Sequence, residues 1–179
     1  KACLEMLNIS KSVEIQSIAD IPSSGSGLGS SSAFTVGLLN ALSNFISEPL
    51  NNTKLAEMAC EVEIDICGAP IGKQDQYGCA IGGLKKIDFN KDNSVNVTII
   101  ENNKKLYSKL EKRLILINTN IHRSASKVLK KQKNNFANNE ERLIEILKAV
   151  PQFHNYLIDQ DFNGINNSIN SYWNTKKNL

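Results

Sequence analysis

The chain has 179 residues, of which 41% are hydrophobic and 22% charged, an ordinary globular composition that argues against wholesale disorder. Its 21 Lys and Arg residues against 18 Asp and Glu residues give a net charge of +3, too small and too scattered to indicate a nucleic-acid-binding surface. The sequence holds no apolar run of the roughly 18 residues that a membrane span needs and no secretory leader pattern, so we expect a soluble, cytoplasmic protein with no membrane partner.

The start of the sequence is unusual. Its first residue is Lys1 rather than Met, and the apolar-periodic stretch that follows has no helix-capping residue before it. This stretch contains Ala2, Leu4, Met6 and Leu7. We therefore expect a fragment of a longer protein.

A strand and a glycine-rich loop are predicted ahead of the first long helix. Apolar and polar residues roughly alternate over 13–21, which favours a strand that Pro22 ends. Residues 23–32 contain only Ser, Gly and one Leu, as expected of a loop. From about Ser31 apolar residues recur every three or four positions, which predicts a helix. These residues are Phe34, Leu38, Leu42 and Phe45.

A second helix is predicted from Thr53, its expected N-cap, to about Cys67. Its apolar stripe comprises Leu55, Met58, Ala59, Val62 and Ile66. Glu57 and Glu61 fall on the opposite, solvated face. Glu63 lies at the margin of the stripe, where it points toward the interior or a cleft.

The remaining chain predicts a sheet with helices on one side. Residues 71–83 form a glycine-rich loop. Short strands are expected at 84–89, 95–100 and 113–118, and helices at 124–133, at 139–149 and around Ile165, Ile169 and Trp173.

The four cysteines, Cys3, Cys60, Cys67 and Cys79, form no Cys-X-X-Cys pair. We therefore expect buried, reduced thiols rather than disulfides or metal ligands.

The loop before the first long helix has the features of a phosphate cradle. Gly25, Gly27 and Gly29 allow positive φ, so that backbone N–H groups can converge on an anion at the positive end of the following helix. The loop has no Lys, which excludes a Walker A motif, and Ser30 stands where a dinucleotide fingerprint needs a third Gly. The alternative is a flexible linker.

Two acidic residues follow the loop. Glu63 at the stripe margin could be a metal ligand, and Asp75 in the glycine-rich turn could accept or orient a hydroxyl proton, the two functions that phosphoryl transfer needs besides a phosphate cradle. Taken singly, each is more typical of a solvated or capping residue.

These motifs resemble those of the galactokinase, homoserine kinase, mevalonate kinase and phosphomevalonate kinase (GHMP) superfamily. Its ATP-binding motif is similar to residues 22–33, and its glutamate upstream of Gly-x-x-Asp-Gln is similar to Glu63 with residues 72–76. The D-glycero-D-manno-heptose 7-phosphate kinase branch is the most similar. Further similarity to that branch lies in Gly82 and Gly83 and in residues 119–124 and 172–177.

The resemblance implies an ATP- and Mg²⁺-dependent sugar kinase that phosphorylates the anomeric hydroxyl of a heptose 7-phosphate-like sugar. Ser31 and Glu63 would hold Mg²⁺, and Asp75 would be the catalytic base or orienting group. The implied nucleotide-binding residues are Ser24, Gly25, Ser26, Gly27, Leu28, Gly29, Ser30, Ser31 and Ser32. The implied sugar-binding residues are Gly72, Gln76 and Arg123, with Lys127 as an alternative cation for the distal phosphate.

The resemblance also implies an α+β fold that is incomplete at both ends. Residues 1–115 would belong to the N-terminal ATP-binding domain and 116–179 would begin the C-terminal domain. The superfamily's N-terminal sugar-contacting motif and its C-terminal glycine-rich motif are missing from the sequence, so we expect the chain alone to be poorly active. Alternatives are a kinase for galactose, fucose or an N-acetylhexosamine, and a non-catalytic protein that binds a nucleotide or a partner; a homo-oligomer is left open.

Overall fold

The computed structural model describes residues 1–20, 27–100, 104–117, 128–129, 132, 134–177 and 179. The chain divides into two compact units. The first contains Lys1–Gly82 and Asn118–Lys130, and the second contains Gly83–Ile117 and Lys131–Leu179. The expected domain division after residue 115 stays a prediction.

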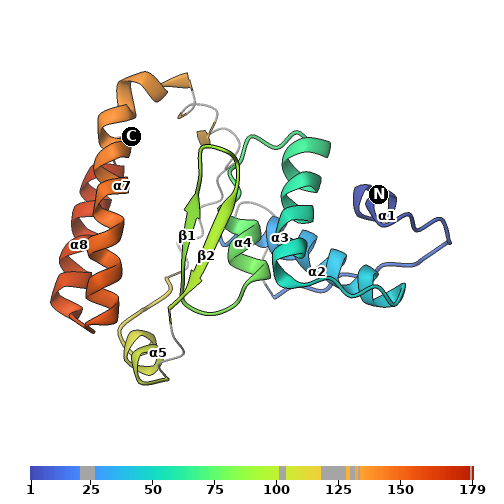
Figure 1. Ribbon diagram of the computed structural model, residues 1–179, viewed down its shortest axis with the longest axis horizontal. Coiled ribbons are helices and arrows are strands. Elements are labelled where there is room, and N and C mark those ends of the chain that lie inside the picture. The colour runs from blue at the N-terminus through green and yellow to red at the C-terminus, as the bar shows by residue number, and fades with distance from the viewer. Residues whose placement is uncertain (21–26, 101–103, 118–127, 130–131, 133, 178) are drawn as a thin grey trace. The chain divides into compact units, whose positions relative to one another are not determined.

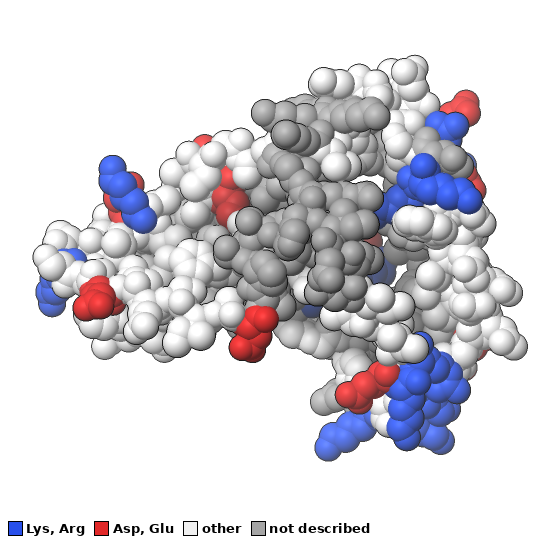
Figure 2. Space-filling model, turned by 180° about the vertical axis from the view of Figure 1, so that it is seen from behind, with Lys and Arg blue, Asp and Glu red and all other residues white. Residues whose placement is uncertain are grey.

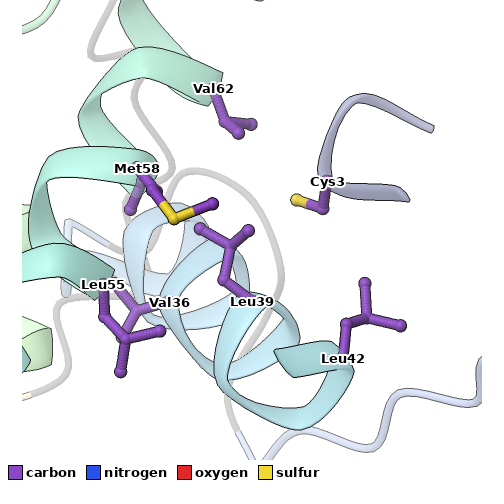
Figure 3. Packing of buried hydrophobic residues seen from close by; sticks show 8 residues of the cluster. Cys3, Val36, Leu39, Leu42, Leu55, Met58 and Val62 are labelled. Atoms are coloured by element: carbon purple, nitrogen blue, oxygen red, sulfur yellow. The ribbon is translucent and has the colours of Figure 1, made fainter. Parts of the chain in front are cut away.

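Helices build the described part of the first unit (Figure 1). They are α1 (Ala2–Met6), α2 (Ser30–Phe45), α3 (Asn52–Cys60), the π-helical segment η1 (Glu61–Ile66) and α4 (Gln74–Ala80). α2, α3 and α4 pack against one another. Leu39 of α2 is completely buried and lies beside Met58 of α3 (Figure 3). The buried cluster around them comprises Cys3, Val36, Leu39, Leu42, Leu55, Met58, Ala59 and Val62.

The first predicted helix is confirmed as α2, but its buried face differs from the prediction. Phe34 and Phe45 are 50% and 62% exposed, whereas the hydroxyl residues Ser32, Thr35 and Ser43 are buried. The buried face of α2 therefore includes three hydroxyl residues, which apolar spacing alone does not reveal.

The second predicted helix is present, with two corrections. Its N-cap is Asn51, whose Oδ1 accepts a hydrogen bond of 2.8 Å from the N–H of Lys54, so Thr53 was the wrong cap. The helix continues as η1, whose wider turns rotate the following residues relative to an α-helix. Ile66 is consequently 51% exposed instead of lying on the buried stripe.

Three predictions of local structure are wrong. The described residues of 13–21 and of 113–118 form no strand. An extended segment becomes a strand only when its backbone groups pair with a neighbour, and local alternation does not supply one. The predicted loop over 71–83 contains the helix α4, whose short helical stretch is masked by one glycine before it, one inside it and two after it.

The second unit contains an antiparallel hairpin of β1 (Lys85–Phe89) and β2 (Val95–Ile99), which confirms two of the predicted strands. The helices that the structure delimits in this unit are α5 (Lys104–Glu111), α7 (Phe136–Ile158) and α8 (Phe162–Lys176). α7 and α8 confirm the two predicted C-terminal helices, α7 being longer than expected, and pack against each other. Most of the helix predicted over 124–133 lies outside the described residues. Its buried hydrophobic cluster comprises Ile100, Leu106, Leu157 and Ile165.

A helix-rich chain with one small sheet is compatible with the expected α+β class. Among the described residues, no helix is both long enough and apolar enough to cross a bilayer. On the face that Figure 2 shows, basic side chains lie in several separate groups, with acidic side chains near some of them.

The N-cap of α3 can be tested by substitution. We expect Asn51→Ala to lower the free energy of unfolding by about 1 kcal/mol, because it removes the side-chain acceptor for the N–H of Lys54. Thr53→Ala, the matched control within the first turn, should change it by less than about 0.5 kcal/mol. Urea unfolding followed by circular dichroism measures both, and a larger loss in the Thr53 variant would contradict the assignment.

Candidate functional site

The carboxylate of Glu63 is buried in the first unit and hydrogen-bonded from two other helices. Only 5% of the residue is exposed. Oε1 accepts a hydrogen bond from the hydroxyl of Ser31, and Oε2 accepts one of 2.7 Å from the hydroxyl of Ser32. The side-chain amide of Gln76 on α4 also donates to Oε2. These donors compensate the carboxylate for the water that it loses on burial.

The π-helical geometry of η1 helps to place this carboxylate. The N–H of Cys67 donates to the backbone carbonyl of Val62 over 2.9 Å, five residues back along the chain, which is the spacing of a π-helix. Single π turns inside helices occur frequently at functional sites. The prediction that Glu63 points into the interior is confirmed, as is the exposure of Glu57 and Glu61.

The end of the serine-glycine loop forms the start of α2. Gly27 and Gly29 have φ of +70° and +67°, the left-handed conformation that the glycine pattern predicts. Gly29 is the N-cap of α2, so Ser30, Ser31 and Ser32 form the first turn, where backbone N–H groups and the helix dipole favour an anion. Leu28 is 48% exposed. Ser24, Gly25 and Ser26 lie outside the described residues, and so does Arg123.

Asp75 lies next to this helix start. A Cβ placed on Gly29 would be 3.6 Å from Oδ2 of Asp75. Asp75 belongs to the first turn of α4 and is exposed, whereas the next residue, Gln76, is completely buried. Gly72 precedes α4, is exposed, and has no atom within 4 Å of an added Cβ. The structure therefore brings Gly29, Ser31, Ser32, Glu63, Asp75 and Gln76 together.

The donor set fits a magnesium ion that also binds a nucleotide. Mg²⁺ usually takes one or two protein oxygens and completes its octahedron with phosphates and water. Ser31 and Glu63 supply two hard oxygens in direct contact at the N-terminus of a helix. Among the described residues no three His, Cys, Asp or Glu side chains gather to bind a metal, so a metal cage made of such protein ligands alone is not present there.

The cysteines differ in their surroundings. The described structure contains no disulfide among the four; Cys3 and Cys60 are buried, whereas Cys67 and Cys79 are exposed and were wrongly expected to be buried. Burial raises the pKa of the Cys60 thiol to about 11, the positive charge of Lys73 opposing this shift and the carboxylate of Glu63 adding to it. Cys60 is therefore a protonated part of the core beside the site.

Two features of the site are not apparent from the sequence. No local propensity marks the π turn, and nothing in the spacing indicates that Ser32 and Gln76 donate to the same oxygen of Glu63. The only signal for the latter was indirect: Gln76 follows Asp75 in the Gly-x-x-Asp-Gln segment, where sequence similarity suggested a sugar contact.

The sequence of this chain is similar to those of known kinases. Residues 1–83 match the model of the GHMP kinases N terminal domain. The chain is 31% identical over 170 residues to D-glycero-alpha-D-manno-heptose 7-phosphate kinase of Campylobacter jejuni, covering 93% of this chain and 49% of that protein. It is 36% identical over 86 residues to mevalonate kinase of Methanothermobacter thermautotrophicus. That match covers 48% of this chain and 28% of that protein. The resemblance to GHMP kinases is confirmed.

Gly29, the N-cap of α2, and Gly37, inside that helix, offer a matched test of the helix start. We expect Gly29→Ala to destabilise the fold by about 1–2 kcal/mol, because its φ of +67° strains any L side chain. Gly37→Ala in the helix interior should stabilise it by about 0.5–1 kcal/mol, since no atom lies within 4 Å of the added methyl group. Urea unfolding measures both, and two changes of the same sign would contradict the described helix start.

Proposed function

We propose, from the match of residues 1–83 to the GHMP kinase N-terminal domain, that this chain is part of an ATP-dependent sugar kinase with a GHMP-like fold. The observation that carries the proposal is the contact between Ser31 at the start of α2 and the buried carboxylate of Glu63, with Asp75 beside the same helix start. This arrangement offers two cation ligands, an anion-binding helix end and a hydroxyl-orienting group in one place.

The nucleotide would bind along residues 22–32, with its phosphates at the N–H groups of the first turn of α2. The nine nucleotide-binding residues expected between 24 and 32 keep this role in the proposal. Ser31 Oγ and Glu63 Oε1 would hold Mg²⁺, which supplies charge that offsets the negative charge of the transferring phosphoryl group. The dipole of α2 adds a partial positive charge at the same end.

Asp75 would orient the acceptor hydroxyl and take its proton. Its exposed carboxylate near Gly29 lies where a second substrate can approach the nucleotide end of α2. Phosphoryl transfer proceeds through a loose transition state, so the main contribution of such a group is to position the hydroxyl in line with the phosphorus.

The acceptor in this proposal is a heptose 7-phosphate-like sugar, by similarity to the Campylobacter relative. Gly72 and Arg123 are the proposed sugar-side residues, whereas Gln76, expected there too, is completely buried against Glu63. The guanidinium of Arg123 suits a bidentate contact with a distal phosphate. We propose further that these 179 residues alone turn over slowly, because they lack two motifs of the kinases that they resemble.

Nucleotide binding is the direct test of the cation ligands. We expect the chain to bind ATP more tightly with Mg²⁺ than with EDTA in isothermal titration calorimetry. Glu63→Gln should remove most of this Mg²⁺ enhancement and weaken binding at least about tenfold, because it removes a charged ligand. Glu61→Gln, the same change on an exposed neighbour, should retain it. Heat that is absent at millimolar Mg-ATP in the unchanged chain would refute the nucleotide site.

The acceptor and Asp75 are tested by radiolabelled phosphate transfer to heptose 7-phosphate, galactose, fucose and N-acetylhexosamine. We expect a slow rate that is highest with heptose 7-phosphate and falls at least about a hundredfold in Asp75→Asn, with unchanged Mg-ATP affinity. Asp65→Asn, an exposed control, should keep the rate.

Three outcomes of the transfer assay would change the proposal. A higher rate with another sugar would replace the proposed substrate. A rate of about 1–100 per second, typical of kinases, would contradict slow turnover. Transfer that is indifferent to Asp75→Asn would remove this residue from the mechanism.

A further inference from the structure

The two oxygens of the Glu63 carboxylate have different partners. Oε1 accepts from Ser31, whereas Oε2 accepts from both Ser32 and Gln76. In the proposed cation site Oε1 is the ligand, so the hydrogen bonds to Oε2 lie one step away from the metal.

The two sides of the carboxylate also differ in exposure. Ser31 is an exposed residue, whereas Ser32 is 2% exposed and Gln76 is completely buried. The bond to Oε1 is thus part-buried beside an exposed residue, whereas both bonds to Oε2 are buried. The two donors to Oε2 limit rotation of the carboxylate about its Cγ–Cδ bond, because such a rotation would break the hydrogen bonds from Ser32 and Gln76.

The amide of Gln76 is not explained by core packing. Its Oε1 is buried and has no hydrogen-bond partner among the described residues. Such an unpaired buried acceptor destabilises the fold, and an apolar side chain of the same length would avoid this cost. The described contact that distinguishes Gln from such a side chain is the hydrogen bond from Nε2 to Glu63.

We propose that Gln76, together with Ser32, is a positioning residue that fixes Oε2 of Glu63 and thereby presents Oε1 and the Ser31 hydroxyl to a divalent cation. This inference rests on the proposed function. Gln76 directly follows Asp75 on α4, so one short helix both anchors the cation ligand and carries the group that faces the acceptor. Hydrogen bonds to the far oxygen of a metal-binding carboxylate commonly tune metal affinity by 10–100-fold.

The test compares Gln76→Met with Gln74→Met. Methionine matches glutamine in length but cannot donate, and Gln74 is an exposed glutamine on the same helix. Mn²⁺ serves as the probe, titrated by electron paramagnetic resonance in the presence of a non-hydrolysable ATP analogue. We expect the Kd for Mn²⁺ to rise about 10–100-fold in Gln76→Met and less than about twofold in Gln74→Met. The affinity for the analogue in EDTA should be the same in all three chains.

Each other outcome has a defined meaning. A Kd for Mn²⁺ in folded Gln76→Met equal to that of the unchanged chain overturns the inference and leaves the proposed function intact, even if the melting temperature falls. An unchanged chain that binds neither Mn²⁺ nor the analogue overturns the proposed function, and this inference with it. If Gln76→Met does not fold, Ser32→Ala removes the other donor to the same oxygen, and an unaltered Kd for Mn²⁺ in that variant overturns the inference.

Discussion

The buried carboxylate of Glu63 is the constraint on which the first unit depends. A charged group removed from water is costly unless hydrogen bonds replace its hydration, and here α2 supplies two hydroxyl donors and α4 one amide donor. These bonds link η1 to α2, which is distant from it in sequence, and to α4, the next helix along the chain. The hydrophobic cluster around Leu39 stabilises the helix packing, but it does not fix which way the carboxylate points.

This arrangement explains why stability and the proposed chemistry are tied together. Ser31 donates to Glu63 only because Gly29 ends the loop in a left-handed conformation and starts α2 at Ser30. The carboxylate of Asp75 lies beside this glycine, since a Cβ placed on Gly29 would be 3.6 Å from its Oδ2. A site that uses a helix start, a buried acid and an exposed acid thus comes from three short segments, the start of α2, η1 and α4. All three lie within 1–83, the region that matches the GHMP kinases N terminal domain.

The sequence predicted what depends on local periodicity and little of what depends on distant partners. The apolar spacing found α2, α8 and the interior-facing Glu63, because these follow from helical geometry within a few residues. It failed for the strand over 13–21, since strand pairing is decided elsewhere in the chain. It also missed the exposure of Ile66, which follows from a π turn that no residue type signals. Within the site, the donors to Oε2 were unpredictable because they depend on the packing of α2 and α4 against η1.

The most direct measurement of the account is a crystal structure of the chain with Mn²⁺ and a non-hydrolysable ATP analogue, with anomalous data that locate the metal. The account requires an anomalous peak about 2.0–2.2 Å from both Ser31 Oγ and Glu63 Oε1, the analogue's phosphates at the first turn of α2, and Gln76 still bonded to Oε2. A peak away from these two oxygens, or phosphates bound elsewhere than at the start of α2, would contradict it.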